Sequence, residues 1–562
     1  MTGRALLALS TIGLLASCGA PAPPRTPPPE PRPRIVVAVV LDQLATQTLE
    51  RHLPHLPDDG ALRHGIARGA FHHRVVYPYA GTYTAAGHAA IATGAPPAVS
   101  GVVANEVYDR ARARAVAIVD DGEHAVHAVR NAYASPRALR VETVADVLAR
   151  TTEGRVVSVS IKDRAVVFTA GREPDLALWY DARLPGYTTS TFYGEVPAWL
   201  AAWQREHPID ALLTPWVPGD PALLARVAGA DDAEGEGDWD GLGVTFPHDP
   251  RASDDPYSVL RATPQSSEHL LELATEAARR AGLGEDDVPD LLVLSISSTD
   301  YVAHTFGPDS WEYLDNLIRV DRALAAFLER LERERGPIAV LLTSDHGGAP
   351  LPERSGTGRV MPDVIARELE AELDRALGEG EWVSAFVQPF VYLSEHARED
   401  EARRERAVEA AIAWLSTRPE IGFAADAAGA LGWRDDADPM RRALGLSVAD
   451  DPEGDVFVVP REGFVVDEDM PRGFGTSHGT PWSYDRNVPV ILWGAGVAHL
   501  ETDAPLPQGR VASTLAALLG VAPPAAAPRE PLPGVGWRPH SRARPSGAGP
   551  SVRSELPVPG VQ

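Results

Sequence analysis

Runs of apolar, β-branched residues alternate along the chain with longer segments of helical periodicity. The apolar runs predict buried strands, and the spacing of apolar residues between them predicts helices such as Tyr313–Glu334 and Met361–Leu377. The predicted strands are Ile35–Leu41, Val156–Ile161, Leu291–Ile296, Ile338–Leu342 and Val488–Trp493. This alternation indicates an α/β protein with a mostly parallel central sheet and helices on both faces.

Polar residues directly follow four of these predicted strands. In chain order they are Asp42, then Lys162 with Arg164, then Asp300, and finally Asp345 with His346. In parallel α/β sheets, ligands bind beyond the carboxyl ends of the strands. The pattern therefore predicts a site at one edge of the sheet.

Two stretches interrupt the alternation. Residues 185–288 are rich in Trp and Pro and contain an acidic, Gly-rich run, Asp231–Gly243, which predicts an inserted cap region. Residues 350–470 are predicted to be a second insertion, mainly helical. No internal repeat is visible. We therefore expect one catalytic domain over about 35–530 that carries both insertions.

The first 18 residues have the pattern of a signal peptide. A short charged start precedes an apolar run, Ala5 to Leu15, that is too short to span a membrane. The sequence Leu15-Ala-Ser-Cys18 resembles the bacterial lipobox, in which the cysteine is lipidated. Cys18 is the single cysteine, so no disulfide can form within the chain. We expect export and a lipid anchor at the cell envelope, on the periplasmic or outer-membrane face; an ordinary signal peptide is the alternative.

The two ends beyond the predicted domain have a different composition. Residues 19–34 are dominated by proline and predict an extended linker, and residues 531–562 predict a loose Pro-rich tail. The oligomeric state is left open by the sequence, and a monomer is compatible with it.

Net charge narrows the possible partners. The 562-residue chain carries a formal charge of -26, which argues against a nucleic-acid partner, because a phosphate backbone needs a basic surface. A small anion can still be attracted by a bound metal ion. Lys162 is the single lysine, against dozens of arginines. Its retention indicates a position that needs a compact ammonium group, unless it is there by chance.

Three aspartates and three histidines are candidate metal ligands. Asp300 and His304 are four residues apart and share a face if a helix begins there. The pair Asp345-His346 ends a buried strand and needs partners or a metal to offset desolvation. Asp42 also ends a strand, although a helix cap is its alternative role, and His478 lies in a Gly-rich loop. Together these types of ligand suit a pair of divalent ions, most plausibly zinc.

Thr84 is the candidate nucleophile. It precedes Ala85-Ala-Gly-His88, and a helix that begins here would point its N-terminal amides at an anion. A threonine alkoxide forms near neutral pH only where a metal or base lowers its pKa. A plain helix-capping role is the alternative for Thr84, and His88 is interpreted as structural.

Taken in order, these motifs resemble the alkaline phosphatase superfamily, specifically the phosphate-irrepressible bacterial alkaline phosphatases with a threonine nucleophile. They cover most of residues 35–520. The matching pieces are the strand that ends at Asp42, Thr84-Ala-Ala-Gly-His88 with Gly94, Gly101-Val-Val-Ala-Asn105 to Asp109, Ser160-Ile-Lys162-Asp-Arg164, Ser298-Thr-Asp300 to His304 and Pro308, Ser344-Asp345-His346-Gly, and Ser477-His478-Gly.

The resemblance implies a zinc-dependent phosphate monoester hydrolase with two Zn²⁺ ions per chain. Asp300, His304 and His478 would hold one ion. Asp42, Asp345 and His346 would hold the other, with the Thr84 oxygen as a further ligand. Paired metals roughly 3.5–4 Å apart can stabilise both the attacking and the leaving oxygen.

The resemblance also implies roles for the remaining site residues. Thr84 would attack small phosphate monoesters and form a covalent phosphothreonine, which water would then hydrolyse. Asn105, Lys162 and Arg164 would hold the non-bridging phosphate oxygens, the lysine as a point charge and the arginine as a forked donor.

Two alternatives remain. The nucleotide pyrophosphatase/phosphodiesterase branch shares the threonine and the ligands but lacks the Lys162-Asp-Arg164 element, and two donors on phosphate oxygens favour a monoester dianion. A catalytically silent metal-binding relative is the second alternative, although every ligand and the nucleophile are present. Sulfatases need a cysteine or serine where Thr84 stands.

Overall fold

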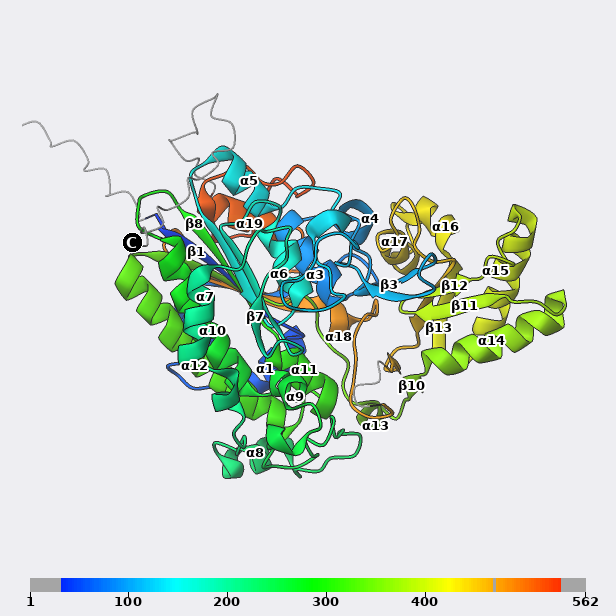
Figure 1. Cartoon of the computed structure of the whole chain (residues 1–562), viewed down its shortest axis with the longest axis horizontal. Helices are drawn as coiled ribbons and strands as arrows, with labels where there is room; N and C mark the ends of the chain where they lie inside the picture. Colours follow the sequence, from blue (N-terminus) through cyan, green and yellow to red (C-terminus); the bar gives the residue numbers. More distant parts are fainter. Residues whose placement is uncertain (1–31, 468–471, 537–562) are drawn as a thin grey trace, which may run out of the picture.

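The computed structural model describes residues 32–467 and 472–536. The predicted signal peptide with Cys18, nearly all of the predicted linker and most of the predicted tail lie outside these residues. Within the described part, no helix has the length and apolar character needed to cross a membrane. Figure 1 shows a large domain built around a twisted sheet, with a smaller lobe beside it.

A ten-stranded sheet forms the centre of the large domain. Its strands lie in the order β17 (Leu500–Thr502), β2 (Ala70–Val76), β16 (Asn487–Gly494), β9 (Ile338–Thr343), β1 (Ile35–Leu41), β8 (Asp290–Ile296), β5 (Val156–Ser160), β6 (Leu176–Asp181) and β7 (Gly186–Thr188), and β18 (Leu506–Pro507) pairs with β2. The five inner strands from β9 to β6 are parallel, whereas β16 and β7 are antiparallel to their neighbours. All five predicted strands are present.

Helices cover both faces of this sheet, as predicted. One face carries α1 (Thr46–His52), α2 (Ala61–Arg68), α10 (Pro264–Ala281), α11 (Ser298–Phe306) and α12 (Trp311–Arg335). The other carries α3 (Thr84–Thr93), α5 (Val144–Thr151), α6 (Asp163–Ala170) and α19 (Arg510–Leu519). Because successive side chains of a strand point to opposite faces, Val37 and Val39 pack into the first layer, and Val36 and Val40 into the second.

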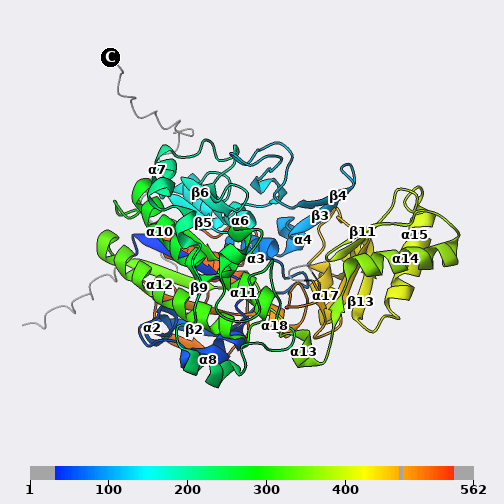
Figure 2. The same cartoon turned by 60° about the horizontal axis from the view of Figure 1, so that its bottom comes forward.

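The smaller lobe contains a sheet of its own. Four antiparallel strands lie in the order β11 (Val383–Val387), β12 (Phe390–Leu393), β14 (Val456–Pro460) and β13 (Ile421–Asp426), next to α14 (Pro362–Leu377) and α15 (Glu401–Leu415). A short pair, β10 (Arg359–Val360) and β15 (Val465–Val466), lies nearby. Figure 2 shows this lobe at the side of the large domain. The expectation of a mainly helical insertion over 350–470 was therefore incomplete, because strands such as β11 are half exposed and give no continuous apolar run.

Short elements complete the fold. They are the hairpin β3 (Glu106–Asp109) and β4 (Arg114–Ala117), and the helices α4 (Pro97–Ser100), α7 (Ala198–Glu206), α8 (Pro221–Ala228), α9 (Pro256–Val259), α13 (Pro352–Ser355), α16 (Ala427–Ala430), α17 (Pro439–Gly445) and α18 (Ser483–Arg486). The segment 185–288 is tied to α12, since the Trp216 indole donates to Asp315 Oδ2 at 2.7 Å. Its last helix, α10, packs in the layer on the main sheet.

Strand register brings the predicted polar residues to one edge. Val40 of β1 pairs with Ser295 of β8 and with Thr343 of β9, and Ser160 of β5 also pairs with Ser295. These parallel strands therefore end level with one another. β16 runs the opposite way and pairs Asn487 with Val76 of β2, so the loop before β16 and the segment after β2 reach the same edge.

Candidate active site

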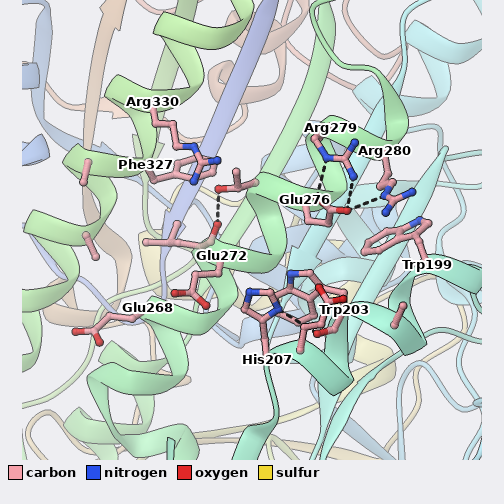
Figure 3. Close-up of a pocket in the computed structure, with 16 residues that line it drawn as sticks. Trp199, Trp203, His207, Glu268, Glu272, Glu276, Arg279, Arg280, Phe327 and Arg330 are labelled. Atoms are coloured by element: carbon pink, nitrogen blue, oxygen red, sulfur yellow. Dashed lines mark hydrogen bonds and ion pairs between the residues drawn. The ribbon is translucent and has the colours of Figure 1, made fainter. Parts of the chain in front are cut away.

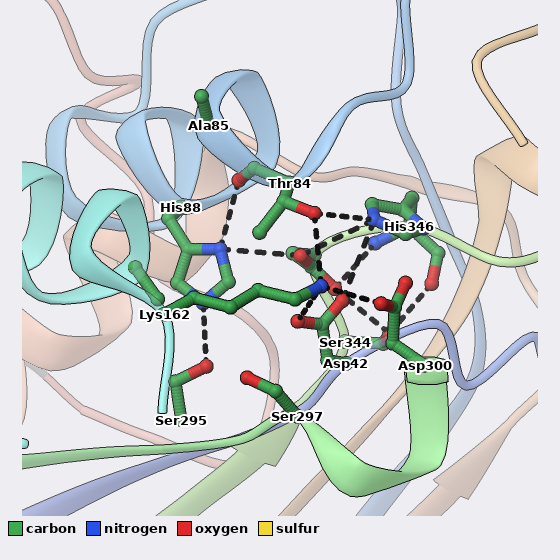
Figure 4. A network of polar contacts seen from close by, with 12 residues as sticks. Asp42, Thr84, Ala85, His88, Lys162, Ser295, Ser297, Asp300, Ser344 and His346 are labelled. Atoms are coloured by element: carbon green, nitrogen blue, oxygen red, sulfur yellow. Dashed lines mark hydrogen bonds and ion pairs between the residues drawn. The ribbon is translucent and has the colours of Figure 1, made fainter. Parts of the chain in front are cut away.

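The predicted ligands and the predicted nucleophile meet at this edge of the sheet. Figure 4 shows Asp42, Asp300 and His346 beside Thr84. Asp42 follows β1, Asp300 and His304 lie on α11, and Asp345 and His346 follow β9. His478 lies in the loop before α18, and all six of these residues are at most 5% exposed. Thr84 is the first residue of α3, the helix start that the sequence predicted, and Lys162 lies directly before α6.

One candidate metal group consists of Asp42, Asp345 and His346. A ligand atom of each lies within 4.8 Å of the others. His346 Nε2 is 3.3 Å from Asp345 Oδ2 and 3.5 Å from Asp42 Oδ1. Thr84 Oγ1 is 3.4 Å from the same imidazole nitrogen. The geometry therefore places the hydroxyl beside this group.

A second candidate group centres on Asp300. Its Oδ1 is 3.3 Å from His304 Nε2, across one turn of α11, and 3.8 Å from His478 Nε2. Ligand atoms of Asp300, His346 and His478 also lie within 4.8 Å of one another. The His346 and His478 rings stack with their centroids 3.6 Å apart, so the two groups are adjacent.

The three histidines are oriented by backbone carbonyls. A carbonyl can only accept, so the Nδ1 atom that contacts it carries the proton and Nε2 keeps its lone pair for a metal. The contacts are His304 Nδ1 to Thr476 O at 2.8 Å, His346 Nδ1 to Gly347 O at 2.9 Å, and His478 Nδ1 to Thr82 O at 2.7 Å.

The donor set fits divalent cations. Asp42 Oδ1 is buried and accepts no hydrogen bond from any described residue. Burial, and then repulsion from Asp300 and Asp345, raises the pKa of the Asp42 carboxyl well above its usual range. A bound cation would offset both the cost of burying the Asp42 carboxylate and its repulsion from Asp300 and Asp345. Three carboxylates and three imidazoles form a ligand set that zinc commonly binds.

Lys162 lies inside this cluster and is only 1% exposed. Its ammonium nitrogen is 2.5 Å from Asp300 Oδ2, 2.8 Å from Asp42 Oδ2 and 3.4 Å from Thr84 Oγ1. Burial alone would lower the pKa of Lys162, but Asp300 and Asp42 outweigh it and hold that pKa above its ordinary value. The lone lysine is therefore charged and points at the hydroxyl.

Asn105 and Arg164 lie at the mouth of the cluster. The Asn105 Oδ1 atom accepts from the Ala85 amide at 2.9 Å, which leaves the side-chain nitrogen as a donor. The Arg164 Nε atom is buried and donates to no described residue. Both side chains line a cavity of about 660 Å³. Asn105 and Arg164, two of the three residues predicted to bind phosphate, therefore border the same cavity.

Several supporting residues gave no signal in the sequence. Gln43 follows Asp42 with a φ of 62°, a strained value for a non-glycine residue. With its amide nitrogen turned toward Asp300, it donates to Asp300 Oδ1 at 3.1 Å. His88, predicted to be structural, has its Nδ1 atom 3.2 Å from Asp345 Oδ2. Only the unusual dihedral marks Gln43, and no sequence pattern reveals it.

An aromatic stack lies against the Lys162 ammonium group. The Lys162 ammonium lies 5.0 Å from the ring centre of Tyr301, and Tyr301 stacks on Trp239 at 5.5 Å. The Arg261 guanidinium lies over both rings and donates to the Tyr301 hydroxyl at 3.0 Å. Trp239 belongs to the acidic, Gly-rich run of the predicted cap region, so this region reaches the site through Tyr301.

A second cavity, of about 710 Å³, lies between α7, α10 and α12. Figure 3 shows its lining, which includes Trp199, Glu272 and Arg330. None of the predicted site residues borders it. Cavity size alone therefore does not locate the candidate site.

Comparison with known proteins agrees with this geometry. A profile of the type I phosphodiesterase/nucleotide pyrophosphatase family matches residues 36–466. The chain belongs to this family. Its membership of the alkaline phosphatase superfamily, predicted from the ordered motifs, is thereby confirmed.

Individual relatives match along nearly the whole chain. The alkaline phosphatase PafA of Elizabethkingia meningoseptica is 28% identical over 89% of this chain and 94% of its own length. A Myroides odoratus protein named as a calcium-transporting ATPase is 28% identical (87% and 92%), and the alkaline phosphatase PhoV of Synechococcus elongatus is 28% identical (88% and 91%).

A solved structure confirms the predicted fold class. The crystal structure of wild-type alkaline phosphatase PafA superposes with a TM-score of 0.82 at 27% identity, covering 90% of this chain and 99% of that one. Together with the names of two relatives, this match supports a phosphatase whose buried carboxylates and imidazoles are candidate metal ligands.

Proposed function

We propose that the chain is a zinc-dependent phosphate monoester hydrolase of the alkaline phosphatase type, acting through a covalent phosphothreonine at Thr84. One observation carries the proposal. Thr84 Oγ1 lies at the start of α3, 3.4 Å from both His346 Nε2 and Lys162 Nζ. A hydroxyl between candidate metal ligands and a buried ammonium group is in the setting that an oxygen nucleophile needs.

Two zinc ions would occupy the adjacent groups. Asp42, Asp345 and His346, with Thr84, would hold one, and Asp300, His304 and His478 the other. When bound, such ions lower the pKa of oxygen nucleophiles and stabilise charge on the attacking and leaving oxygens.

The chain's own residues would bind and orient the phosphate. The Thr84 hydroxyl loses its proton to solvent and its oxygen attacks phosphorus. The bond between phosphorus and the alcohol oxygen breaks, the alcohol leaves with a proton from water, and phosphothreonine forms. Lys162, Arg164 and the Asn105 amide hold the non-bridging oxygens, and the N-terminal end of α3, where Thr84 lies, adds its partial positive charge. Water then attacks phosphorus from the opposite side, the bond to Thr84 breaks, and the hydroxyl regains a proton.

Phosphodiester hydrolysis is the second candidate, because the matching family profile is named for it. A diester carries a second substituent in the space where Lys162 and Arg164 would contact oxygens. A monoester offers phosphate oxygens to both of these cations, whereas a diester offers a phosphate oxygen to only one of them. Their presence therefore favours the monoester.

Three further proposals concern the whole chain. Residues 35–530 form the catalytic domain with insertions at about 185–288 and 350–470. The protein is exported and held at the cell envelope by a lipid on Cys18, and it acts on small phosphate esters without a nucleic-acid partner. Loss of metabolic palmitate labelling in a Cys18→Ser variant is the expected result; retained labelling would contradict the anchor.

The deciding experiment compares kcat/KM for an aryl phosphate monoester, the matching methyl diester and ATP, with zinc-loaded and chelated protein. We expect zinc-dependent monoester hydrolysis that exceeds diester hydrolysis by orders of magnitude. A diester preference would assign the chain to phosphodiesterases. The absence of zinc-dependent activity on all three would favour a silent relative.

A further inference from the structure

None of the candidate metal ligands lines the cavity that Asn105 and Arg164 border. It has a volume of about 660 Å³, which lies in the range of sites for drug-sized molecules. The large domain supplies one wall, including Asn105, Arg164 and Val119. The smaller lobe supplies the facing wall through α14 and β11. A ligand whose phosphate contacts Asn105 and Arg164 therefore has its remaining atoms between the two lobes.

The wall opposite the phosphate end is mainly apolar. Met361 and Ala366 come from the start of α14, and Phe386 and Val387 come from the end of β11. Phe386 is 8% exposed and also packs in the core of the smaller lobe, so its ring is held in place. A fixed aromatic ring with aliphatic neighbours binds a flat or branched apolar group better than a hydrated one.

The charged side chains of the cavity carry a negative excess. Four carboxylates line it, Glu106, Asp163, Asp363 and Asp467, against the two guanidinium groups of Arg164 and Arg472. Arg472 pairs with Asp363 at 2.9 Å, and Arg164 lies at the phosphate end beside Asn105. Among the described residues that line the cavity, carboxylates therefore outnumber guanidinium groups, and a ligand that carries a second anionic group would be repelled by this excess.

The geometry points to this inter-lobe cavity as the binding site for the alcohol portion of the substrate, and it assigns the substrates as monoesters of uncharged or cationic alcohols with an apolar body of at least one ring. This inference rests on the proposed monoesterase function and gives the smaller lobe a role in specificity. Esters whose alcohol carries a further phosphate or carboxylate are disfavoured.

The test uses esters whose alcohols have nearly equal acidity, so that intrinsic reactivity cancels. With zinc-loaded, full-length protein, kcat/KM for benzyl phosphate should exceed that for methyl phosphate by about tenfold to a hundredfold, because the ring leaves water. The 4-carbamoylbenzyl ester should exceed the 4-carboxybenzyl ester by at least about fivefold, because the two differ in charge and hardly in shape.

Variants locate the preference in the cavity. Phe386→Ala removes the aromatic wall and should reduce the benzyl/methyl ratio at least about threefold. Ala366→Phe fills the cavity and should reduce the ratio without removing a core ring. Asp363→Asn should narrow the gap between the carbamoyl and carboxy esters. Phe423→Ala is the matched control, because Phe423 belongs to the same lobe but does not line the cavity.

Calorimetric binding of benzylphosphonate and methylphosphonate gives a readout independent of turnover. Equal affinities and equal kcat/KM values for the benzyl and methyl compounds would overturn the assignment. So would a preference that Phe386→Ala and Ala366→Phe leave unchanged. If neither ester is hydrolysed but benzylphosphonate still binds more tightly in a Phe386-dependent manner, the proposed function fails and the cavity assignment stands.

Discussion

At the scale of single residues, the reactivity of Thr84 depends on neighbours that carry charge. A free threonine hydroxyl is hardly ionised near neutral pH, so it needs a cation or a base close by. The Lys162 ammonium and the His346 imidazole are each 3.4 Å from its oxygen. In the proposed mechanism these two groups would stabilise an alkoxide at Thr84, so Thr84 is the residue whose loss should matter most.

Replacement of Thr84 by alanine should reduce kcat/KM for an aryl phosphate by roughly 10³-fold or more, because it removes the attacking oxygen. Intact-mass measurement after an acid quench should show a phosphate adduct in the wild type and none in Thr84→Ala. Thr84→Ser is the matched control and should keep the adduct. Wild-type turnover by Thr84→Ala would contradict the assigned nucleophile.

The two cations of the Lys162-Asp-Arg164 element should distinguish between ester types. Lys162→Ala and Arg164→Ala should lower kcat/KM for a monoester roughly tenfold to a hundredfold more than for the matching diester, since a dianion offers more charge to contact. Arg155→Ala provides the control, because Arg155 contacts Gly282 O at the opposite end of β5. Equal losses on both esters would disprove the assigned contacts.

At the residue scale, the sequence marked polar residues that follow predicted strands. Asp42, Lys162, Asp300 and the Asp345-His346 pair were named in this way, and the structure brings them together. Their roles in metal binding and catalysis stay predictions. Gln43 and Tyr301 were not given a role, because their contribution depends on partners distant in sequence. Tyr301 matters through its stack with Trp239, 62 positions earlier in the chain, and no local pattern encodes that contact.

At the scale of elements, the site exists because parallel strands end level. Four inner strands deliver their carboxyl ends to one edge, and α3 approaches that edge closely. A Cβ atom on Gly87 of α3 would lie 2.2 Å from Asp345 O, so only glycine allows this approach. The Ala-Ala-Gly sequence after Thr84 thus explains how the helix and the metal-ligand loop can touch.

The aromatic stack beneath Lys162 gives an element-level prediction. Trp239→Ala removes the ring that supports Tyr301 and should lower the free energy of unfolding by about 3–5 kcal/mol. It should also reduce kcat for monoesters, because Tyr301 holds the Lys162 ammonium. Trp239→Phe should restore most of the activity if stacking is the cause. Full kcat in Trp239→Ala, with only its stability reduced, would show that the stack does not position Lys162.

Strands with a continuous apolar run and long helices were predictable from the sequence, and short or half-exposed elements were not. The five predicted strands are all fully buried in their central residues, and both named helices match within two residues at each end. The strands of the smaller lobe were missed, since each is four to six residues long and partly exposed or flanked by helical pattern. The pairing of these strands depends on contacts between residues that are far apart in the sequence, and a local sequence pattern does not contain this information.

At the scale of the whole molecule, the two segments that interrupt the alternation of predicted strands and helices, 185–288 and 350–470, lie against the site. The segment 185–288 reaches it through Trp239, and the smaller lobe closes the cavity beside Arg164. Sequence reasoning located both segments but could not place them, because their contacts are made by scattered single residues. The fold class, in contrast, followed directly from the alternation of buried strands and helices.

A buried acid in the predicted cap region makes stability depend on pH. Burial, and then repulsion from Glu312, raises the pKa of Glu236 from its ordinary 4.5 to about 8. The folded chain therefore keeps a proton that the unfolded chain loses between these pH values. It follows that the free energy of unfolding falls as pH rises through this window.

Glu236→Gln should make this slope shallower by up to about 1.4 kcal/mol per pH unit. Urea denaturation midpoints at a series of pH values from mildly acidic to mildly alkaline, in zinc-saturated buffer, would measure the difference between variant and wild type. Glu234→Gln, an exposed neighbour, should keep the wild-type slope. Parallel curves for wild type and Glu236→Gln would contradict a buried, protonated Glu236.

Metal removal should affect the stability of the entire domain. Asp42, Asp300 and Asp345 are at most 2% exposed, and Lys162 pairs with Asp42 and Asp300. Zinc that binds only the folded chain adds about 2.7 kcal/mol per site to the free energy of unfolding at a hundredfold excess over its Kd, so chelation should lower Tm by several degrees.

Native mass spectrometry should show two zinc ions bound to the wild type and fewer bound to His478→Ala. His64→Ala is the control, because His64 is exposed, and it should keep both ions. Identical Tm values with zinc and with chelator would mean that these carboxylates and imidazoles hold no metal. The proposed attack by Thr84 would then lack the metal cations that lower the pKa of its hydroxyl.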